Sequence, residues 1–463
     1  MQYISNTDKD KKDMLDAIGV SLFESLISVV PKSLRQFRMD IPEGESELEL
    51  FRELVEIGKA NHHFYDYASF LGAGNYDHFI PTVVNHLAHR GEFITSYTPY
   101  QGEASQGTLQ FIYEYQSLMC ELTAMDYSNA SMYDGASSLA EAALLALRSS
   151  GRKKILIPTT VHPEYRSVTR TYLSALDCEM LEIPMKEGLT DMAALKAFLG
   201  PDVAAVVAQQ PNFFGNLENM QTVSDFTHEA GALFIACVNP ISLGILAPPG
   251  EYGADIAVGE GQPLGNAVSF GGPHFGFFTV KADLLRKIPG RIAGMTLDKK
   301  GRRSFVLTLQ AREQHIRREK ATSNICTNHS LCALKAAIYL SMLGKKGLKK
   351  LSLINLQKAQ EARNRLLKIK GVSAFAEQPF FNEFALKIDR EPQSLKESFR
   401  RHKILGPLHL KDFYPEMDSV YLIAVTENRT LEEVERLAQA ISKAEECTSS
   451  LSRREHKIHG ITR

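Results

Sequence analysis

Three apolar segments decide the fold of this chain: Val203-Ala204-Ala205-Val206-Val207-Ala208, Leu233-Phe234-Ile235-Ala236-Cys237-Val238 and Asp255-Ile256-Ala257-Val258. Between the first and the second lies Val223–Glu229, which is predicted to be helical. A strand that is apolar on both faces is buried on both faces, and such strands alternating with helices are typical of a parallel α/β sheet. These segments therefore predict a parallel sheet covered by helices.

The same alternation continues on both sides of these segments. The predicted strands are Ala130–Tyr133, Lys154–Ile157, Met180–Ile183, Val203–Ala208, Ala232–Val238, Asp255–Val258 and Phe275–Val280. Further helices are predicted at Ala136–Leu147 and Met192–Leu199. After them come a long helix from about Leu331, strand-like segments at Phe384–Ile388 and Val420–Val425, and a last helix from Thr430. The chain is thus predicted to be α/β, with a mostly parallel seven-stranded sheet and a C-terminal α+β small domain.

The N-terminal part of the chain is predicted to be helical. Apolar residues recur at helical spacing from Met14 to Leu26, and Pro31 is expected to end that helix. A second helix is expected from Ser46, because Glu49 stands three residues later in a capping box. A short helix is expected at Pro81–Ala88. The predicted divisions are a helical arm (1–70), a large α/β domain with interface loops (71–330), a C-terminal α+β domain (331–450) and a polar tail (451–463).

Composition excludes several classes of protein. The chain has 463 residues, 53 Lys and Arg against 54 Asp and Glu, and a formal net charge of −1. A near-neutral chain is not expected to bind nucleic acid through bulk electrostatics, and no apolar run approaches the roughly 20 residues that span a bilayer. The polar start of the chain matches neither a signal peptide nor a transit peptide, so a cytoplasmic protein is expected.

Metal and nucleotide motifs are missing from the sequence. The six cysteines include no Cys-x-x-Cys pair, so neither a zinc site nor a thioredoxin-type motif is expected; reduced core thiols are the simpler interpretation. The glycines of Gly259–Gly265 have the wrong spacing for a dinucleotide fingerprint, and no P-loop motif is present.

The predicted architecture resembles the aminotransferase-type (fold type I) pyridoxal-phosphate enzymes. In that fold the cofactor's phosphate sits at a helix N-terminus, where free N–H groups and the helix dipole favour an anion. The segment Asp134–Ser138 opens the expected helix at that place, although it could equally be an ordinary helix start. His162 follows the Lys154–Ile157 strand, where the fold places a residue that stacks on the cofactor ring; a loop or capping histidine is the alternative.

Two side chains essential to such an enzyme are missing. A pyridoxal-phosphate enzyme needs a lysine for the Schiff base and an acidic partner for the pyridine nitrogen. Between Ala197 and Val280 there is no Lys or Arg, and the strand Leu233–Val238 carries no Asp. Where the lysine is expected, the chain has Gly259-Glu260-Gly261. The chain is therefore not expected to hold the cofactor covalently, which argues against a self-sufficient decarboxylase or aminotransferase.

Three longer motifs carry a specific resemblance. They are FLGAGNYDH (Phe70–His78), YTPYQGEASQG (Tyr97–Gly107) and REQHIRREKATSNICT (Arg312–Thr327). With these motifs the chain resembles glycine decarboxylase, the P protein of the glycine cleavage system, from its first helix to about Ala444. In the two-chain form of that family it resembles subunit 1, the half without the cofactor lysine.

The resemblance implies an activity and partners. The family decarboxylates glycine with pyridoxal phosphate and passes the aminomethyl group to the oxidised lipoyl arm of H protein. The cofactor is then expected in a lysine-bearing partner, glycine dehydrogenase subunit 2, in a heterodimer or heterotetramer. A non-catalytic interaction or regulatory subunit of a pyridoxal-phosphate enzyme remains the alternative.

Active sites of this fold lie between two subunits of similar shape, which implies candidate residues that complete the partner's site. Tyr97, Tyr100, Gln101 and Glu103 are the catalytic candidates, with Glu103 placed to orient Gln101 or a substrate group. The candidates for the partner's phosphate are Thr322, Ser323 and Asn324. The alternative is that these residues only form the interface.

One segment is strongly basic. Residues 281–330 contain twelve Lys and Arg against four Asp and Glu. A solvated surface explains most charge runs, and the alternative is electrostatic attraction of an acidic lipoyl carrier.

Overall fold

The computed structural model describes residues 5–35, 41–42, 44–64, 66–95 and 97–445. The predicted polar tail (451–463) and Cys447 lie outside these residues. The chain divides into two units, Met1–His63 and Phe64–Arg463, which are described separately. Within the described residues, no helix has the length and apolarity that crossing a membrane requires. Those residues also contain no group of three or more His, Cys, Asp or Glu side chains able to hold a metal ion.

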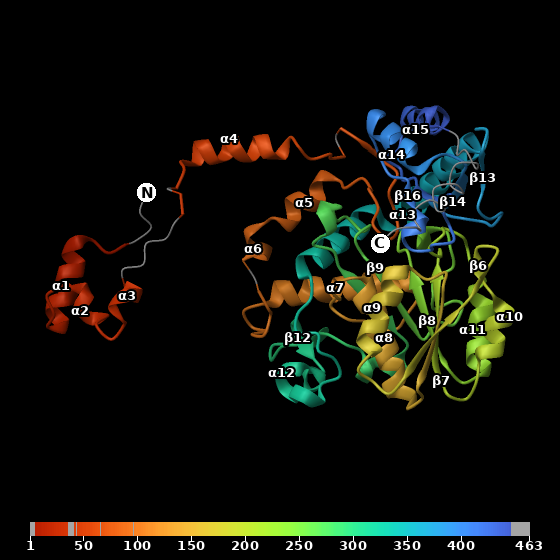
Figure 1. Ribbon diagram of the computed structural model, residues 1–463. Helices are drawn as coiled ribbons and strands as arrows, with labels where there is room; N and C mark the ends of the chain where they lie inside the picture. The colour runs from red at the N-terminus through yellow and green to blue at the C-terminus, as the bar shows by residue number, and fades with distance from the viewer. Residues whose placement is uncertain (1–4, 36–40, 43, 65, 96, 446–463) are drawn as a thin grey trace, which may run out of the picture. The chain divides into compact units, whose positions relative to one another are not determined.

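A seven-stranded sheet in the order β2-β10-β9-β8-β7-β3-β4 organises the second unit. Its strands β7, β8 and β9 are labelled in Figure 1. Its strands are β2 (Tyr127–Ser128), β3 (Lys154–Pro158), β4 (Glu179–Ile183), β7 (Val203–Gln210), β8 (Leu233–Val238), β9 (Ile256–Glu260) and β10 (Gly276–Val280). The strands β4, β3, β7, β8 and β9 pair in parallel, and β10 pairs antiparallel with both β9 and β2. The predicted mostly parallel sheet is confirmed.

The first predicted strand is displaced. Instead of Ala130–Tyr133, the chain pairs at Tyr127–Ser128 and keeps only an isolated bridge from Met132 to Gly276. Ser131 has a φ of 117°, and its N–H donates to the Asn129 side chain at 3.1 Å. This local turn interrupts the ladder, because an Asn side chain that bonds its own backbone competes with strand pairing.

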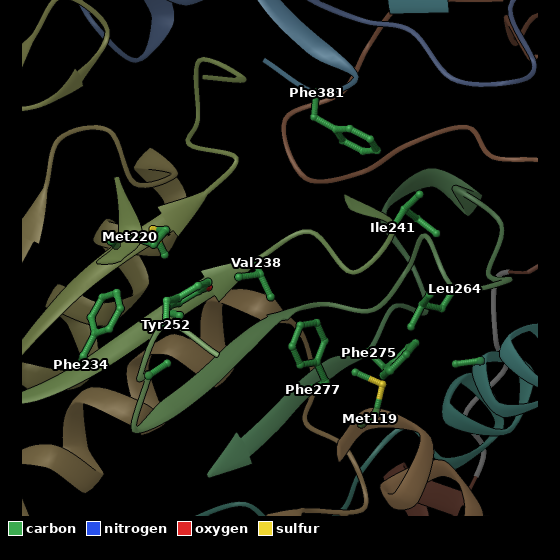
Figure 2. Close-up of a cluster of buried hydrophobic side chains, with 14 of the residues drawn as sticks. Met119, Met220, Phe234, Val238, Ile241, Tyr252, Leu264, Phe275, Phe277 and Phe381 are labelled. Carbon is green, nitrogen blue, oxygen red and sulfur yellow. The ribbon is translucent and has the colours of Figure 1, made fainter. Parts of the chain in front are cut away.

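Helices cover both faces of the sheet. On one face, the alanine-rich side of α8 (Gly135–Ser150) packs with α9 (Pro163–Leu173) against β3, β7 and β8. On the other face lie α7 (Gln106–Thr123), α11 (Met220–Glu229) and part of the long helix α13 (Ser330–Leu366). Figure 2 shows this second layer, in which Met119, Met220 and the rings of Phe234, Phe275 and Phe277 fill the core.

The C-terminal α+β part follows α13 and has a four-stranded antiparallel sheet in the order β13-β14-β17-β16. Its elements are β13 (Val372–Ala374), β14 (Glu383–Ile388), α14 (Pro392–Arg401), β15 (Ile404–Leu405), β16 (Leu408–His409), β17 (Val420–Ala424) and α15 (Leu431–Lys443). Thr430 and Glu433 form a capping box at the start of α15. The strand β1 (Ala68–Ser69) pairs in parallel with β15, so these two residues of the second unit are joined to this part.

Smaller elements complete the second unit. They are α5 (Thr82–Ala88), α6 (Gly91–Ile94), α10 (Met192–Phe198), α12 (Gln314–Arg317), the hairpin β5 (Met185–Lys186) with β6 (Leu189–Thr190), and the hairpin β11 (Ile292–Leu297) with β12 (Arg303–Thr308).

The described residues of the first unit form four helices, none of which has a buried residue. They are α1 (Asp8–Ile18), α2 (Phe23–Leu26), α3 (Lys32–Arg35) and α4 (Glu47–Gly58). The expected single helix up to Pro31 is broken, because Gly19 adopts a φ of 82° and ends α1 in a left-handed cap. The expected capping box of Ser46 and Glu49 is confirmed at the start of α4.

Candidate functional site

Two N–H groups at the N-terminus of α8, those of Gly135 and Ser137, donate to acidic side chains of the chain itself. Asp134 is the N-cap, and its carboxylate accepts from the Ser137 N–H at 2.7 Å. The Gly135 N–H donates to Oε2 of Glu260 at 3.1 Å. The other Glu260 oxygen, Oε1, accepts from the Gln262 N–H at 2.9 Å. Both carboxylates therefore occupy positions that a helix N-terminus offers to an anion.

Glu260 is the last residue of β9. It stands in the segment where a pyridoxal-phosphate enzyme of this fold is expected to carry its Schiff-base lysine. Burial raises the pKa of Glu260 to about 8, and the backbone N–H groups of Gly135 and Gln262 act in the opposite direction. The contact with α8 is close: a Cβ on Gly135 would lie 2.4 Å from the Tyr165 hydroxyl and 2.9 Å from the Glu260 nitrogen.

His162 is buried and both of its ring nitrogens are occupied. It is the N-cap of α9, where Nδ1 accepts from the Glu164 N–H at 3.2 Å. Nε2 lies 2.8 Å from the carbonyl of Ala73, so Nε2 carries the proton of a neutral ring. Burial lowers the pKa of His162 to about 4, which agrees with a neutral ring. The alternative prediction, that His162 caps a helix, is therefore confirmed.

The ring of His162 is covered by other aromatic residues. The ring of Tyr165 stacks on it with centroids 4.6 Å apart and an interplanar angle of 18°. Phe213 meets it edge-on at 4.9 Å. Beside these rings lies a cavity of about 40 Å³, lined among others by Cys237, Glu260 and Glu383. Such a volume accepts a few water molecules, whereas small-molecule sites usually measure about 300 Å³ or more.

Glu383 joins the loop that contains the first long motif to the small domain. Its Oε1 accepts from the Ala73 N–H at 2.7 Å, and its Oε2 accepts from the Tyr76 hydroxyl at 2.9 Å. Tyr76 in turn donates its N–H to Gln262 at 3.0 Å, beyond β9. Glu383 is 4% exposed, and burial raises its pKa from 4.5 to about 7.

The protein should become less stable as the pH rises through the pKa of Glu383. The unfolded carboxyl ionises near pH 4.5 and the folded one near 7, so stability is complete below 4.5 and falls by about 3 kcal/mol as the pH reaches 7. Glu383→Gln keeps a neutral acceptor for Ala73 at every pH. Thermal melts at pH 5.5 and pH 8 should therefore show a smaller loss for E383Q than for the wild type. Equal losses in the two proteins would remove Glu383 as the cause.

Tyr100 is brought to the third motif by Arg291, a residue that the sequence did not mark. Arg291 is buried, and its Nη2 donates to the Tyr100 hydroxyl at 3.2 Å and to the Cys326 carbonyl at 2.6 Å. Its guanidinium lies 5.4 Å from the centre of the Tyr100 ring, which also meets His315 edge-on at 5.4 Å. Two motifs that are about 200 residues apart in sequence are thus held together.

The remaining catalytic candidates lie on the surface of the second unit. Tyr97 is 87% exposed and Tyr100 is 52% exposed. Gln101 and Glu103 are exposed as well. Behind them, Gln106 accepts the Phe305 N–H at 2.8 Å and donates to the Phe305 carbonyl at 2.8 Å. The loop from Tyr97 to Gln106 is therefore anchored at Tyr100 and at Gln106 and presents its polar side chains outward.

The three phosphate candidates differ in their surroundings. Asn324 is exposed and Thr322 is half-buried, with its N–H bonded to the Arg312 carbonyl at 3.1 Å. The Ser323 hydroxyl accepts from the Ile325 N–H at 3.1 Å, and it opposes the burial that raises the pKa of Glu141. Ser323 is thus the least available of the three.

The fold and this site define the class of fold type I pyridoxal-phosphate architectures. A sphingosine-1-phosphate lyase of Burkholderia pseudomallei shares the fold with a TM-score of 0.64 over 89% of this chain and 94% of the lyase, at 12% identity. The family described as "Glycine cleavage system P-protein" matches residues 1–441. The chain belongs to the glycine cleavage system P-protein family.

Individual relatives agree with this family over nearly the full length. A probable glycine dehydrogenase (decarboxylating) subunit 1 of Desulfitobacterium hafniense is 51% identical, with 96% of this chain and all of the relative covered. The probable subunit 1 of Carboxydothermus hydrogenoformans is 50% identical over 95% of this chain and 99% of its own. A crystal structure of glycine decarboxylase (P-protein), in inhibitor-bound form, has a TM-score of 0.88 at 43% identity and covers 96% of this chain and 99% of that one.

Pyridoxal phosphate does not fit the corresponding site of this chain. Glu260 and Asp134 occupy the helix N-terminus that would bind the phosphate, and the rings of Tyr165 and Phe213 already pack on His162, the residue expected to stack on the cofactor ring. On β8, the buried Cys237 lines the cavity, and the strand offers no acidic partner for a pyridine nitrogen. No reaction step is therefore assigned to this cavity.

Proposed function

We propose that this chain is the cofactor-free subunit 1 of a cytoplasmic, two-chain glycine dehydrogenase (decarboxylating). With a lysine-bearing subunit 2, which holds the pyridoxal phosphate, it acts on glycine and delivers the aminomethyl group to the lipoyl arm of H protein. The observation that carries the proposal is the combination of a complete family fold with a cofactor position closed by Glu260 and Tyr165. A chain of this kind keeps the length of its relatives, while the chemistry requires a second chain.

In this proposal the chain contributes the loop from Tyr97 to Gln106 to the partner's site. The bound cofactor supplies the electron sink for decarboxylation. Tyr97, Tyr100 and Gln101 supply hydroxyl and amide groups that orient polar substrate or cofactor atoms, and Glu103 positions Gln101. Arg291 supports this role because it fixes the Tyr100 hydroxyl from behind.

Thr322 and Asn324 are the preferred donors to the partner's phosphate. Ser323 is less favoured, because its hydroxyl already accepts from the Ile325 N–H. H protein is proposed to approach the hairpin of β11 and β12, where Lys299, Lys300 and Arg303 are exposed. A cluster of exposed cations favours the association of an acidic carrier.

The test is reconstitution of the two chains. Each chain alone and both together are assayed for glycine-dependent exchange of labelled CO₂, with lipoylated H protein present. Exchange is expected only with both chains, and borohydride reduction is expected to leave a pyridoxyl-lysine in the partner alone. Full exchange by the partner alone would reject the proposal in favour of a regulatory subunit. A stoichiometric pyridoxyl-lysine in this chain would also reject it.

A further inference from the structure

Glu260 has no role in the proposed activity, yet it makes the most specific contact at the closed cavity. It extends from the end of β9 to the first N–H group of α8, that of Gly135, in a helix of 16 residues. We infer that the Glu260 carboxyl is a built-in replacement for a bound anion: it accepts from this first N–H group and thereby keeps phosphate-bearing ligands out of this chain. This inference rests on the same closed site as the proposed function and goes beyond it by assigning the exclusion of ligands to Glu260.

The hydrogen-bond geometry supports this replacement. A bound phosphate at a helix N-terminus accepts from backbone N–H groups of the helix and of a neighbouring loop. Glu260 does both, because one oxygen accepts from Gly135 in α8 and the other from Gln262 in the loop after β9. A free N–H group at such a place costs free energy when it is buried. The carboxyl removes that cost without a ligand.

Packing around Glu260 leaves no space for a second anion. Gly135 is so close to Tyr165 and to the Glu260 backbone that a single added carbon would overlap them, at 2.4 and 2.9 Å. Tyr165 is in turn held on His162 by ring stacking. Asp134 adds another negative charge next to the same helix end. A phosphate would meet two carboxyl groups and an aromatic ring.

Removing the carboxyl should loosen the start of α8, and a small anion should restore it. Hydrogen exchange is measured by mass spectrometry on peptides that cover residues 134–139, in the full chain alone and with its lysine-bearing partner. Glu260→Ala should exchange roughly tenfold faster there, as expected for a lost helix cap. Formate should bring the rate back towards the wild-type value, whereas the same concentration of neutral formamide should not. Glu141→Ala is the control, because Glu141 lies on the same helix away from its N-terminus.

Ligand exclusion is tested on the same proteins. Inorganic phosphate and pyridoxamine phosphate, which has no aldehyde to react with surface lysines, should leave the wild-type exchange rate of this peptide unchanged. Wild-type protection by either probe would overturn the inference, because the helix end would then be free to bind an anion. An unchanged rate in E260A, or equal rescue by formate and formamide, would also overturn it.

A second variant covers the case in which E260A does not fold. Glu260→Gln keeps the size of the side chain but leaves one oxygen to serve the two N–H donors, and it is compared with the wild type at pH 9, above the pKa of about 8 of Glu260, where the wild-type carboxylate offers two. Its peptide 134–139 should still exchange several-fold faster than that of the wild type. A wild-type rate in E260Q would overturn the inference. The readout involves no turnover of glycine, so its failure is distinct from a failure of the proposed function.

Discussion

Replacing Tyr100 by Phe is expected to lower glycine-dependent CO₂ exchange by the two-chain complex roughly 100-fold, with little change in assembly. The hydroxyl is the group that the proposal assigns to the partner's site. Tyr100 is half-exposed, and its hydroxyl accepts from Arg291. The Phe ring keeps the contacts with Arg291 and His315 that hold the loop. The loss should therefore appear in kcat, measured at saturating glycine and H protein.

Two further variants separate chemistry from structure. Tyr172→Phe is the matched control, because Tyr172 lies on α9 and is also partly exposed, at 37%. It should retain wild-type exchange. Arg291→Lys loses the bonds to Tyr100 and to the Cys326 carbonyl together, so it should weaken assembly as well as kcat. If Y100F and Y172F have the same kcat, the Tyr100 hydroxyl takes no part in the reaction and the loop serves only the interface.

The buried strands could be predicted from sequence because burial leaves a local pattern. A central strand such as Val203–Gln210 is apolar on both faces, so a continuous apolar run marks it. The helices of the C-terminal part were similarly marked, for example by Thr430 and Glu433 in their capping box. The displaced edge strand β2 shows the limit. A single hydrogen bond between Ser131 and Asn129 outweighed an apolar run that favoured Ala130–Tyr133.

The candidate site could be predicted only in part, since its key contacts join distant residues. The absence of a Schiff-base lysine could be predicted, because no lysine occurs in the long stretch between Ala197 and Val280. The sequence also showed Glu260 at the expected lysine position, but it could not show the hydrogen bond to Gly135, which is 125 residues earlier. Arg291 gave no signal at all. It contacts Tyr100 across 191 residues, and no spacing rule relates residues that only the fold brings together.

Gly276→Ala is expected to be strongly destabilising, although it adds only one methyl group. Gly276 opens β10 and exchanges backbone hydrogen bonds with Met132, beneath the start of α8. A Cβ there would lie 2.1 Å from the Asp134 carbonyl oxygen and 2.2 Å from the Ser138 hydroxyl. The start of α8 would have to move away from the sheet, which would also break the bond from Gly135 to Glu260. Overpacking of this kind should cost about 3 kcal/mol or more.

The expected result is a large fall in the denaturant midpoint of the full chain, or the loss of folded protein on expression. Gly107→Ala is the matched control, because Gly107 lies in α7 with no atom within 4 Å of an added Cβ. That substitution should change stability by no more than about 1 kcal/mol, in the stabilising direction, since Ala favours a helix. A wild-type midpoint for G276A would mean that α8 can shift without loss. The close packing of α8 on β10 would then not be what fixes the start of the helix next to Glu260. The hydrogen bond from Gly135 to the Glu260 carboxyl would be the remaining explanation for that position.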